Sequence, residues 1–599
     1  MFGTTWETSE REYEVTVERD LAVPVDDDVD LVGDAFRPDT DEPVPVILSA
    51  SPYNVEFQSA QIAPRSSSAQ NAWIEAGDPY FYARRGYAHV ILNVRGTGKS
   101  GGTFRNLGPR EVEDVAAAIE WLGEQSWCDG SVAMTGISYF GMIQPFVAMH
   151  EPEPLRAIFC PWAASDLYRD WYYQGGIFQH GFTYKWSQQL DDPRCHSWSR
   201  EHLSEAEFDR RVETALADEE IRAHPVLVEA LENPDEEGVN PFLVDVTINR
   251  LDEPGGYFDE RRVSFEHTSV PAYHGADWGH THAHLPAAFR NWANWEGPTK
   301  LLVGPPEFAD RPFYQLAYQS LRWFDHWLLG TDTGIVEEPE VRLFQVGTGA
   351  WKTARDWPLP ETRWTPFYLH PGGLLYERDH LPGDGHDVIE DSPFGRGELE
   401  YVTPPLVERT VVMGPLVLSL YASTTDEEAL FFATLFRVDE DGEETSLTHG
   451  WLRASQARED EARSEPWLVH HPHEEREPVT PGSVNHYRLN VKPTGAVFAP
   501  GERIGLRLAC ADVNYPRGQT IAHSGIREAR SRGEHLSRQS ASRVTIHHDD
   551  RYPSNLLLPV TEGNVLGTFR SGGGALDVDE RMPYEKVWTE TRPDRDSSA

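Results

Sequence analysis

One short segment, residues 136–141 (Gly-Ile-Ser-Tyr-Phe-Gly), constrains this chain more than any other part of it. The segment follows a strand-like run at 131–135 and precedes an apolar helical stretch that continues through Met149. A sharp strand-to-helix turn lifts a serine hydroxyl above the edge of a sheet and aims the next backbone N–H at a developing oxyanion. The usual pattern has glycine two residues after the serine, whereas Phe140 stands there in this chain. The segment predicts an α/β fold and makes Ser138 the candidate nucleophile.

The stretches around this segment alternate between strand and helix patterns. Short strands are expected within 12–50, and buried strands over 89–94 and 155–160. The apolar spacing from Val112 to Leu122 predicts one helix between them. This order predicts a mostly parallel sheet that is covered on both faces. Strand-like runs return at 270–273 and 300–303, followed by a long helix over 316–329.

Two further regions differ from this α/β pattern. Between about 165 and 265, Trp, Tyr, His and charged residues dominate and helical patterns prevail, which predicts a helical cap over the mouth of a site. Beyond Gly334 the chain reads as all-β, with period-two alternation at 503–508 and a hairpin turn at Asp441-Gly442. We expect an α/β core at 1–160 and 266–334, a helical cap at 161–265, and a C-terminal jelly-roll β-sandwich at 335–590.

The charge balance is strongly acidic. The chain has 97 acidic and 53 basic residues, a formal net charge of -44, and only six of the basic residues are lysine. Such a surface repels nucleic acid and anionic membranes, so neither is an expected partner. Acid excess with scarce lysine is similar in style to proteins of salt-loving archaea, in which concentrated salt screens the self-repulsion.

Cysteine usage and hydropathy indicate the compartment. The four cysteines are far apart and form no CxxC pair, which predicts reduced thiols and neither a disulfide framework nor a cysteine zinc site. No apolar run approaches the ~20 residues that span a bilayer, and residues 1–15 do not resemble a secretory signal. We therefore expect a cytoplasmic protein.

Several motifs in a fixed order carry a resemblance to a known family. They are Ser51-Pro52-Tyr53, the glycine-rich turn at 95–102, the Trp-containing stretch at 120–130, and the serine segment at 136–141. The runs at 321–330, 450–455 and 500–503 extend the match into the C-terminal half. Together they resemble the cocaine-esterase and X-Pro dipeptidyl-peptidase family, also called CocE/NonD hydrolases. The resemblance implies an α/β-hydrolase core with a helical cap and a C-terminal jelly-roll.

The same resemblance implies a serine hydrolase, and we expect no cofactor. Ser138 would attack the carbonyl of a small-molecule ester or amide, either an acyl ester or an X-Pro-type peptide, and form an acyl-enzyme. The backbone N–H of Tyr139 and the hydroxyl of Tyr53 would form the oxyanion hole. The aromatic run Trp171-Tyr172-Tyr173 would either shape an acyl pocket or pack the cap on the core. A homo-oligomer is left open.

The chain departs from the family pattern at the acid and the base. The family has an acid in a Gly-Trp-x-Asp pattern, and alignment on Trp278 puts His280 at the Asp position. The family has a base in a Gly-Pro-Trp-x-His pattern, and residues 304–308 (Gly-Pro-Pro-Glu-Phe) put Phe308 at the His position. A catalytically degenerate member that is retained as a binding scaffold is therefore the alternative to an active enzyme.

Substitutes for both groups follow the strand that begins near 271. Asp277, His280, His282 and His284 lie close together in the sequence, so one histidine could serve as a relocated base with Asp277 as the acid. If 277–284 were helical, Asp277, His280 and His284 would share one face and could bind zinc. Gly275 and Gly279 favour a loop instead, and we expect no metal.

Overall fold

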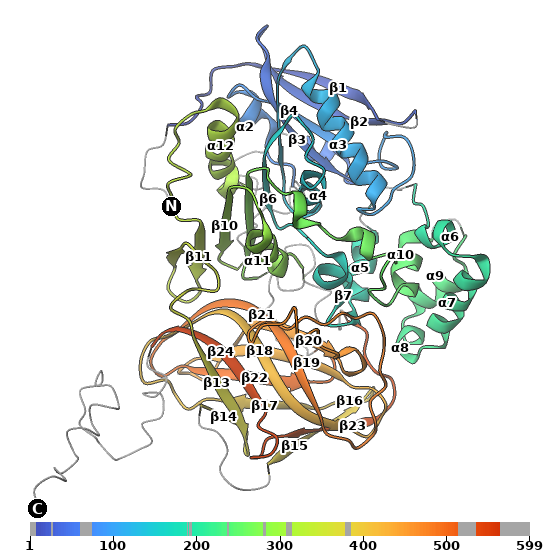
Figure 1. Ribbon diagram of the computed structural model, residues 1–599, viewed down its shortest axis with the longest axis vertical. Helices are drawn as coiled ribbons and strands as arrows, with labels where there is room; N and C mark the ends of the chain where they lie inside the picture. Colours follow the sequence, from blue (N-terminus) through green and yellow to red (C-terminus); the bar gives the residue numbers. More distant parts are fainter. Residues whose placement is uncertain are drawn as a thin grey trace, which may run out of the picture.

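The computed structural model describes residues 7–25, 28–59, 75–188, 190, 194–236, 239–279, 283–306, 314–377, 385–512 and 535–563. It has an α/β region at one end, an all-β region at the other, and helices beside the junction of the two (Figure 1). Among the described residues, no helix is both long enough and apolar enough to cross a bilayer.

A ten-stranded sheet forms the α/β region, in the order β1-β2-β4-β3-β5-β6-β9-β10-β11-β12. The strands from β4 to β11 are parallel, and antiparallel strands lie at both ends. The interior strand β4 is buried along its whole length, as a strand covered on both faces must be. The bounds are β1 Val15–Pro24, β2 Asp30–Pro38, β3 Val44–Ser51, β4 Ala88–Asn93, β5 Cys128–Thr135, β6 Leu155–Pro161, β9 Ala272–Asp277, β10 Thr299–Gly304, β11 Val341–Gln345 and β12 Ala350–Ala354.

Helices cover both faces of this sheet. Alternate residues of β3 point to opposite faces, so Val46 packs in the cluster of α3 and α4, and Ile47 packs in the cluster of α12. The predicted helix over 112–122 is confirmed within α3, and the predicted strands at 89–94 and 155–160 are confirmed as β4 and β6. The helices are α1 Val55–Gln58, α2 Pro79–Ala83, α3 Pro109–Gly123, α4 Tyr139–Ala148, α11 Leu285–Asn294 and α12 Tyr314–Leu329.

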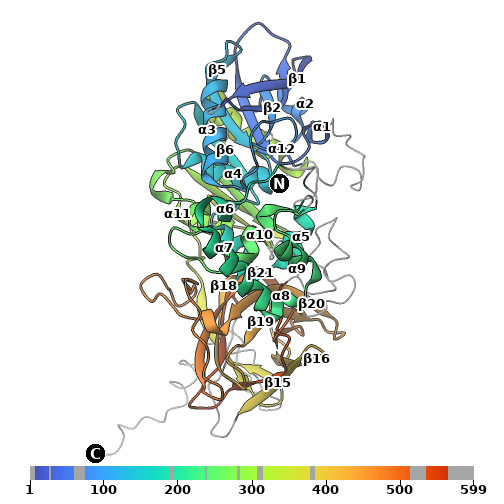
Figure 2. The same cartoon turned by 90° about the vertical axis from the view of Figure 1, so that its right-hand side faces the viewer.

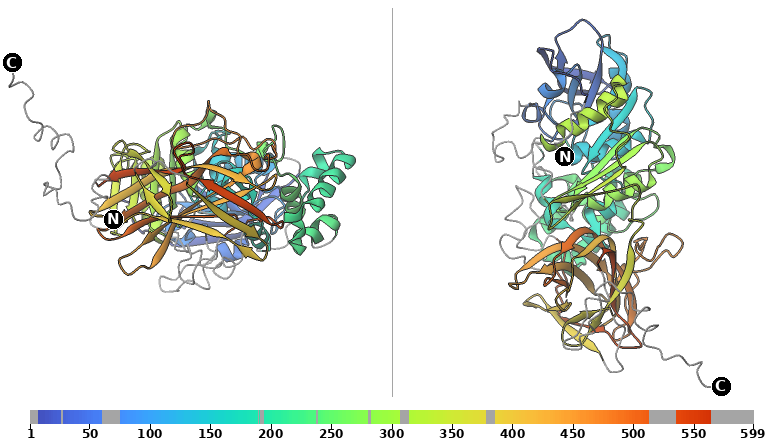
Figure 3. Two further views of the ribbon diagram at one scale, coloured as in Figure 1. Left: turned by 90° about the horizontal axis from the view of Figure 1, so that it is seen from below. Right: turned by 90° about the vertical axis from the view of Figure 1, so that its left-hand side faces the viewer.

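The segment between β6 and β9 forms the helical cap. It begins with a π-helical turn, Tyr168–Tyr172, and a short hairpin that the sequence patterns did not reveal. Its helices project from one side of the molecule (Figures 1 and 3), the side that faces the viewer in Figure 2. The elements are β7 Tyr173–Gln174, β8 Ile177–Phe178, α5 His180–Ser187, α6 Trp198–His202, α7 Glu205–Ala217, α8 Glu219–Arg222, α9 Pro225–Glu232 and α10 Pro241–Ile248.

A twelve-stranded sheet forms the all-β region and closes around an apolar core. It closes because β18 pairs with β21 and also with β23 and β24. The predicted turn at Asp441-Gly442 joins β19 to β20, with Gly442 at a φ of 84°. The bounds are β13 Arg363–His370, β14 Leu374–Tyr376, β15 His386–Ser392, β16 Gly395–Arg396, β17 Glu398–Val402, β18 Thr410–Thr424, β19 Leu430–Val438, β20 Glu444–Arg453, β21 Asn485–Phe498, β22 Arg503–Ala509, β23 Ser542–His547 and β24 Asn555–Glu562.

The chain does not pass directly from the α/β sheet to the all-β region at Gly334. Strands β11 and β12 follow that glycine, and β11 pairs in parallel with β10 of the ten-stranded sheet. The all-β region therefore begins at β13.

A buried ion cluster joins the cap to the all-β region. Arg453, at the end of β20, binds Glu220 of α8 at 2.5 Å and Glu428 at 3.0 Å. The Arg453 side chain is 1% exposed. Burial alone would raise the pKa of Glu220, but the positive charge of Arg453 outweighs it and lowers that pKa. The carboxylate is thus held ionised inside the contact between the two regions.

Candidate functional site

The carboxyl ends of the parallel strands meet at one edge of the ten-stranded sheet, where α/β folds place their sites. Tyr53 follows β3, Ser138 follows β5, and Asp277 ends β9. These strands are close neighbours, in the order β3-β5-β6-β9. The fold therefore brings three of the candidate residues to the same edge.

Ser138 occupies a strained turn between β5 and α4. Its backbone has a φ of 57° and a ψ of -127°, a conformation that L-residues rarely adopt. Gly136 has a φ of 125°, and a Cβ there would lie 2.3 Å from the Cβ of Phe140. A Cβ on Gly141 would lie 2.5 Å from the carbonyl oxygen of Pro161 at the end of β6. The close passage of α4 past β6 explains why glycine stands three residues after the serine.

The Tyr139 side chain turns away from the turn and into the core. Its hydroxyl donates to Oε1 of Glu111 in α3 at 2.5 Å and accepts from the N–H of Leu107 at 3.2 Å. Burial raises the pKa of Glu111 to about 7, although the hydrogen bond from Tyr139 opposes this shift. Burial and the adjacent Glu111 raise the pKa of Tyr139 well above its usual range. The candidate role of Tyr139 is therefore confined to its backbone N–H.

Tyr53 lies next to the serine turn and is half-buried. Its ring centroid is 6.2 Å from that of Tyr139 and 6.1 Å from that of Phe140. The Asn93 amide donates to the Tyr53 carbonyl at 2.7 Å, which fixes the backbone after β3. The Tyr53 hydroxyl oxygen accepts a hydrogen bond from the indole N–H of Trp186 at 3.0 Å. The two residues expected to form the oxyanion hole are thus in ring contact.

The candidate acid and base residues fall partly outside the described residues. Asp277 is fully buried at the end of β9, and its Oδ1 accepts from the N–H of Gly279 at 2.8 Å. His284 is buried at the start of α11, and its Nδ1 lies 3.1 Å from the carbonyl oxygen of Ala163, which follows β6. A carbonyl only accepts, so the hydrogen of this contact is on Nδ1.

His280, His282 and residues 307–308, with Glu307 and Phe308, lie outside the described residues. The helical arrangement that would place Asp277 and His284 on one face is wrong, because Asp277 ends a strand and Leu285 begins α11. No set of three or more His, Cys, Asp or Glu side chains within the described ranges is arranged to hold a metal ion.

The three residues of the aromatic run 171–173 have two kinds of neighbour. The Tyr172 hydroxyl accepts from Asn106 at 2.7 Å, and the Tyr173 hydroxyl donates to the carbonyl of Val246 at 2.7 Å. Both are packing contacts: the first joins the cap to the loop before α3, and the second lies within the cap. Trp171 instead meets the His284 ring edge-on, with centroids 5.4 Å apart.

Sequence patterns did not single out Trp186 or Glu111. Glu111 could have been noticed, because it stands one turn before Val115 on the buried face of α3, where an acid is unusual. Trp186 gave no signal, since tryptophan is common throughout the cap segment. Its contact with Tyr53 joins residues 133 positions apart and depends on how the cap folds over the sheet.

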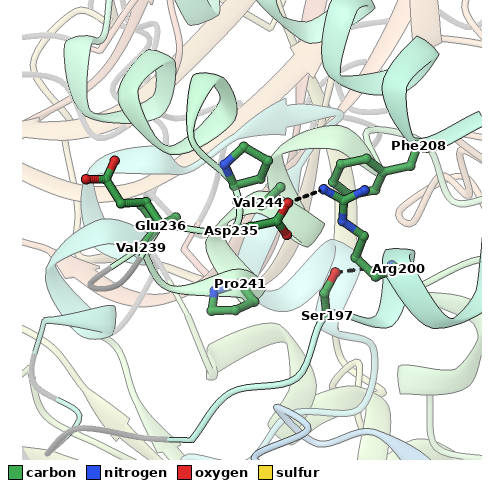
Figure 4. A pocket seen from close by; sticks show the side chains of 9 residues that line it. Ser197, Arg200, Phe208, Asp235, Glu236, Val239, Pro241 and Val244 are labelled. Atoms are coloured by element: carbon green, nitrogen blue, oxygen red, sulfur yellow. Dashed lines mark hydrogen bonds and ion pairs between the residues drawn. The ribbon is translucent and has the colours of Figure 1, made fainter. Parts of the chain in front are cut away.

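Two cavities that cap residues line do not include the candidate residues. One of about 200 Å³ lies among α6, α7 and α10, where Arg200 binds Asp235 at 2.6 Å and lies over the Phe208 ring (Figure 4). Another of about 420 Å³ lies between the start of α3 and the cap. Neither is lined by Tyr53, Ser138 or His284.

The comparisons with known proteins agree with this architecture. Residues 27–307 match the family model of the X-Pro dipeptidyl-peptidase (S15 family), and residues 333–557 match that of the X-Pro dipeptidyl-peptidase C-terminal non-catalytic domain. The chain is 27% identical to the cocaine esterase of Rhodococcus sp., covering 91% of this chain and 98% of the relative. It is 23% identical to a putative Xaa-Pro dipeptidyl-peptidase of Bacillus cereus, covering 80% and 82%.

A solved structure of similar fold is a CocE/NonD family hydrolase from Staphylococcus aureus. It superposes with a TM-score of 0.74 at 22% identity, over 91% of this chain and 93% of that one. The two family models follow one another along the chain in the same order as the α/β sheet and the all-β region. The chain belongs to the CocE/NonD-like X-Pro dipeptidyl-peptidase family.

Proposed function

We propose that this protein is a serine hydrolase that cleaves an ester or an amide through an acyl-enzyme on Ser138. The observation that carries the proposal is the left-handed backbone of Ser138 between β5 and α4. Such strain persists only where the surrounding structure imposes it, and in a strand-to-helix turn it supports a role for the serine hydroxyl as a nucleophile. The family membership of the chain supports the same reaction class.

The roles of the neighbouring residues follow from the chemistry of acyl transfer. The Ser138 hydroxyl attacks the substrate carbonyl, and its proton passes to a base. The backbone N–H of Tyr139 and the hydroxyl of Tyr53 stabilise the oxyanion, and each such donor typically contributes ~10²–10³ in rate. The base then gives the proton to the alcohol or amine, which leaves as its bond to the carbonyl carbon breaks, and water hydrolyses the resulting acyl-enzyme.

His284 is the candidate base with a suitable tautomer. Its Nδ1–H is engaged with the Ala163 carbonyl, so Nε2 would be the nitrogen that takes up the Ser138 proton. Ala163 follows β6, the strand beside β5, so this histidine is tied to the same edge as Ser138. Asp277 is the candidate acid, and His280 remains a second candidate base. Replacement of either histidine by alanine, read as loss of acylation, distinguishes them.

Two substrate classes are candidates: an acyl ester and an X-Pro-type peptide. The cocaine esterase relative matches this chain over nearly its whole length, which supports an ester. The family model and the Bacillus relative support a peptide. A paired assay with p-nitrophenyl acetate and an X-Pro p-nitroanilide separates the two classes.

We also propose that the protein works inside the cell and in concentrated salt. All four cysteines are free thiols, as in reducing compartments. The net charge of -44 supports a highly screened solvent.

The alternative is a catalytically degenerate member that binds a ligand without turnover. Phe308 favours it, because a phenyl ring at the family's base position cannot accept a proton. A serine without a base loses ~10⁴–10⁶ in rate. The two functions therefore differ by a margin that any acylation assay resolves.

The test is fluorophosphonate labelling of wild type and Ser138→Ala, read by intact mass. The serine hydrolase gives one adduct, and the substitution removes it. A folded wild-type protein that gains no mass overturns the mechanism and favours the scaffold. An adduct that persists in Ser138→Ala shows that another nucleophile reacts and equally refutes the assignment.

A further inference from the structure

A tryptophan of the cap is hydrogen-bonded to the candidate oxyanion hole. Trp186 lies in α5, with a side chain that is 4% exposed, and its indole N–H donates to the Tyr53 hydroxyl oxygen at 3.0 Å. Its ring stacks on that of Tyr139, with centroids 6.0 Å apart and planes 10° from parallel. One side chain thus touches both residues that are proposed to stabilise the oxyanion.

Trp186 itself is held firmly by other aromatic rings. Its ring meets that of Phe242 of α10 at 5.4 Å, and that of Trp171 at 5.8 Å. Trp171 in turn contacts His284. Because a buried indole with two edge-on neighbours has little freedom to rotate, the direction of its N–H is set by the cap.

The direction of this hydrogen bond determines what Tyr53 can do. An indole N–H is a donor only, so the Tyr53 oxygen must be the acceptor in this pair. The single hydroxyl hydrogen of Tyr53 must then point away from Trp186. A hydroxyl that accepts one hydrogen bond also becomes a stronger donor in the next. Both effects favour donation from Tyr53 to a developing oxyanion.

We propose that Trp186 is a positioning residue, whose indole N–H holds the Tyr53 hydroxyl in the direction from which it donates to the substrate oxyanion. This inference rests on the proposed function. It makes the cap a part of the catalytic apparatus as well as a cover, because the oxyanion hole is complete only when α5 is in place.

The first experiment is Trp186→Phe, measured with p-nitrophenyl acetate. Removal of an oxyanion donor costs ~10²–10³ in kcat, and loss of its direction alone is expected to cost part of this, about 10-fold. KM should change by less than about 2-fold, because the interaction is made in the transition state. The matched control is Trp198→Phe, which removes the hydrogen bond from another buried cap indole, that to Glu260 at 3.0 Å. Its kcat should be unchanged.

A double-mutant cycle separates positioning from packing. In a Tyr53→Phe background no hydroxyl remains to be positioned, so Trp186→Phe should cause no further loss of kcat. A packing role would lower kcat by the same factor in both backgrounds and would overturn the inference. Replacement of Trp186 by β-(3-benzothienyl)alanine, which keeps the ring and lacks the N–H, gives the same test if the phenylalanine variant does not fold.

The failure of this inference is distinguishable from failure of the proposed function. If wild type takes no fluorophosphonate label, the proposed function fails and the inference falls with it. If Ser138 is labelled but the Trp186 variants retain full kcat, only the positioning role is refuted.

Discussion

Glu111 offers a sharp test of the packing beneath the serine turn. Its carboxyl is buried in α3 and accepts the Tyr139 hydroxyl, and burial raises its pKa from a usual 4.5 to about 7. Between these two pKa values the Glu111 carboxyl is therefore protonated in the folded protein and ionised in the unfolded chain. The free energy of unfolding must fall as the pH rises through the window.

Glu111→Gln removes this titration and keeps an acceptor for Tyr139. As the pH rises across the whole window, the free energy of unfolding of the wild type should fall by about 3 kcal/mol because of this group, at ~1.4 kcal/mol for each pH unit. Between pH 5.5 and 8 the same relation gives about 2 kcal/mol. The free energy of unfolding of Glu111→Gln, relative to that of the wild type, should therefore rise by about 2 kcal/mol as the pH is raised between these values.

The assay is urea unfolding at constant ionic strength, followed by both circular dichroism and tryptophan fluorescence. The control is Glu113→Gln on the exposed face of the same helix, whose side chain is 52% exposed. Its stability should run parallel to that of the wild type. Parallel curves for Glu111→Gln would refute the reasoning, because they would mean that the carboxyl has the same pKa in both states.

Three other predictions concern strain, buried charge and salt. Ser138→Gly relieves the left-handed φ and should stabilise the fold by ~1 kcal/mol in thermal melts, whereas Ser138→Ala keeps the strain and should not; equal stabilities would contradict the strain. Arg453→Met leaves Glu220 and Glu428 without their buried cation and should cost ~3–5 kcal/mol in the urea transition; a neutral result would show that the cluster contributes nothing. The melting temperature should rise with KCl into the molar range, because salt screens a net charge of -44, and a fall would argue against a salt-adapted surface.

Local patterns in the sequence predicted the elements well where packing demands a periodicity. The buried strand over 89–94 and the helix over 112–122 required runs of apolar residues, and both are present as β4 and α3. The serine turn was also visible, because Gly136 and Gly141 are needed for steric reasons that the sequence records.

Features that depend on distant pairing could not be predicted in this way. The sequence reads as all-β beyond Gly334, but this pattern does not say that β11 pairs with β10 rather than with the all-β region. The contact of Trp186 with Tyr53 likewise depends on the path of the whole cap. The roles of His280 and Phe308 stay predictions, because both lie outside the described residues.

Strands β11 and β12 follow Gly334 but belong to the ten-stranded sheet, and this limits where the chain could be cut into two folding units. A chain cut at Gly334 would lack β11 and β12, which leaves an unprotected strand edge on β10. A chain cut just before β13 would keep the sheet whole but would expose its contact with the all-β region and deprive Glu220 of Arg453. Neither half is therefore a self-sufficient module, and a protease that nicks the connection should yield two fragments that stay together until they are denatured.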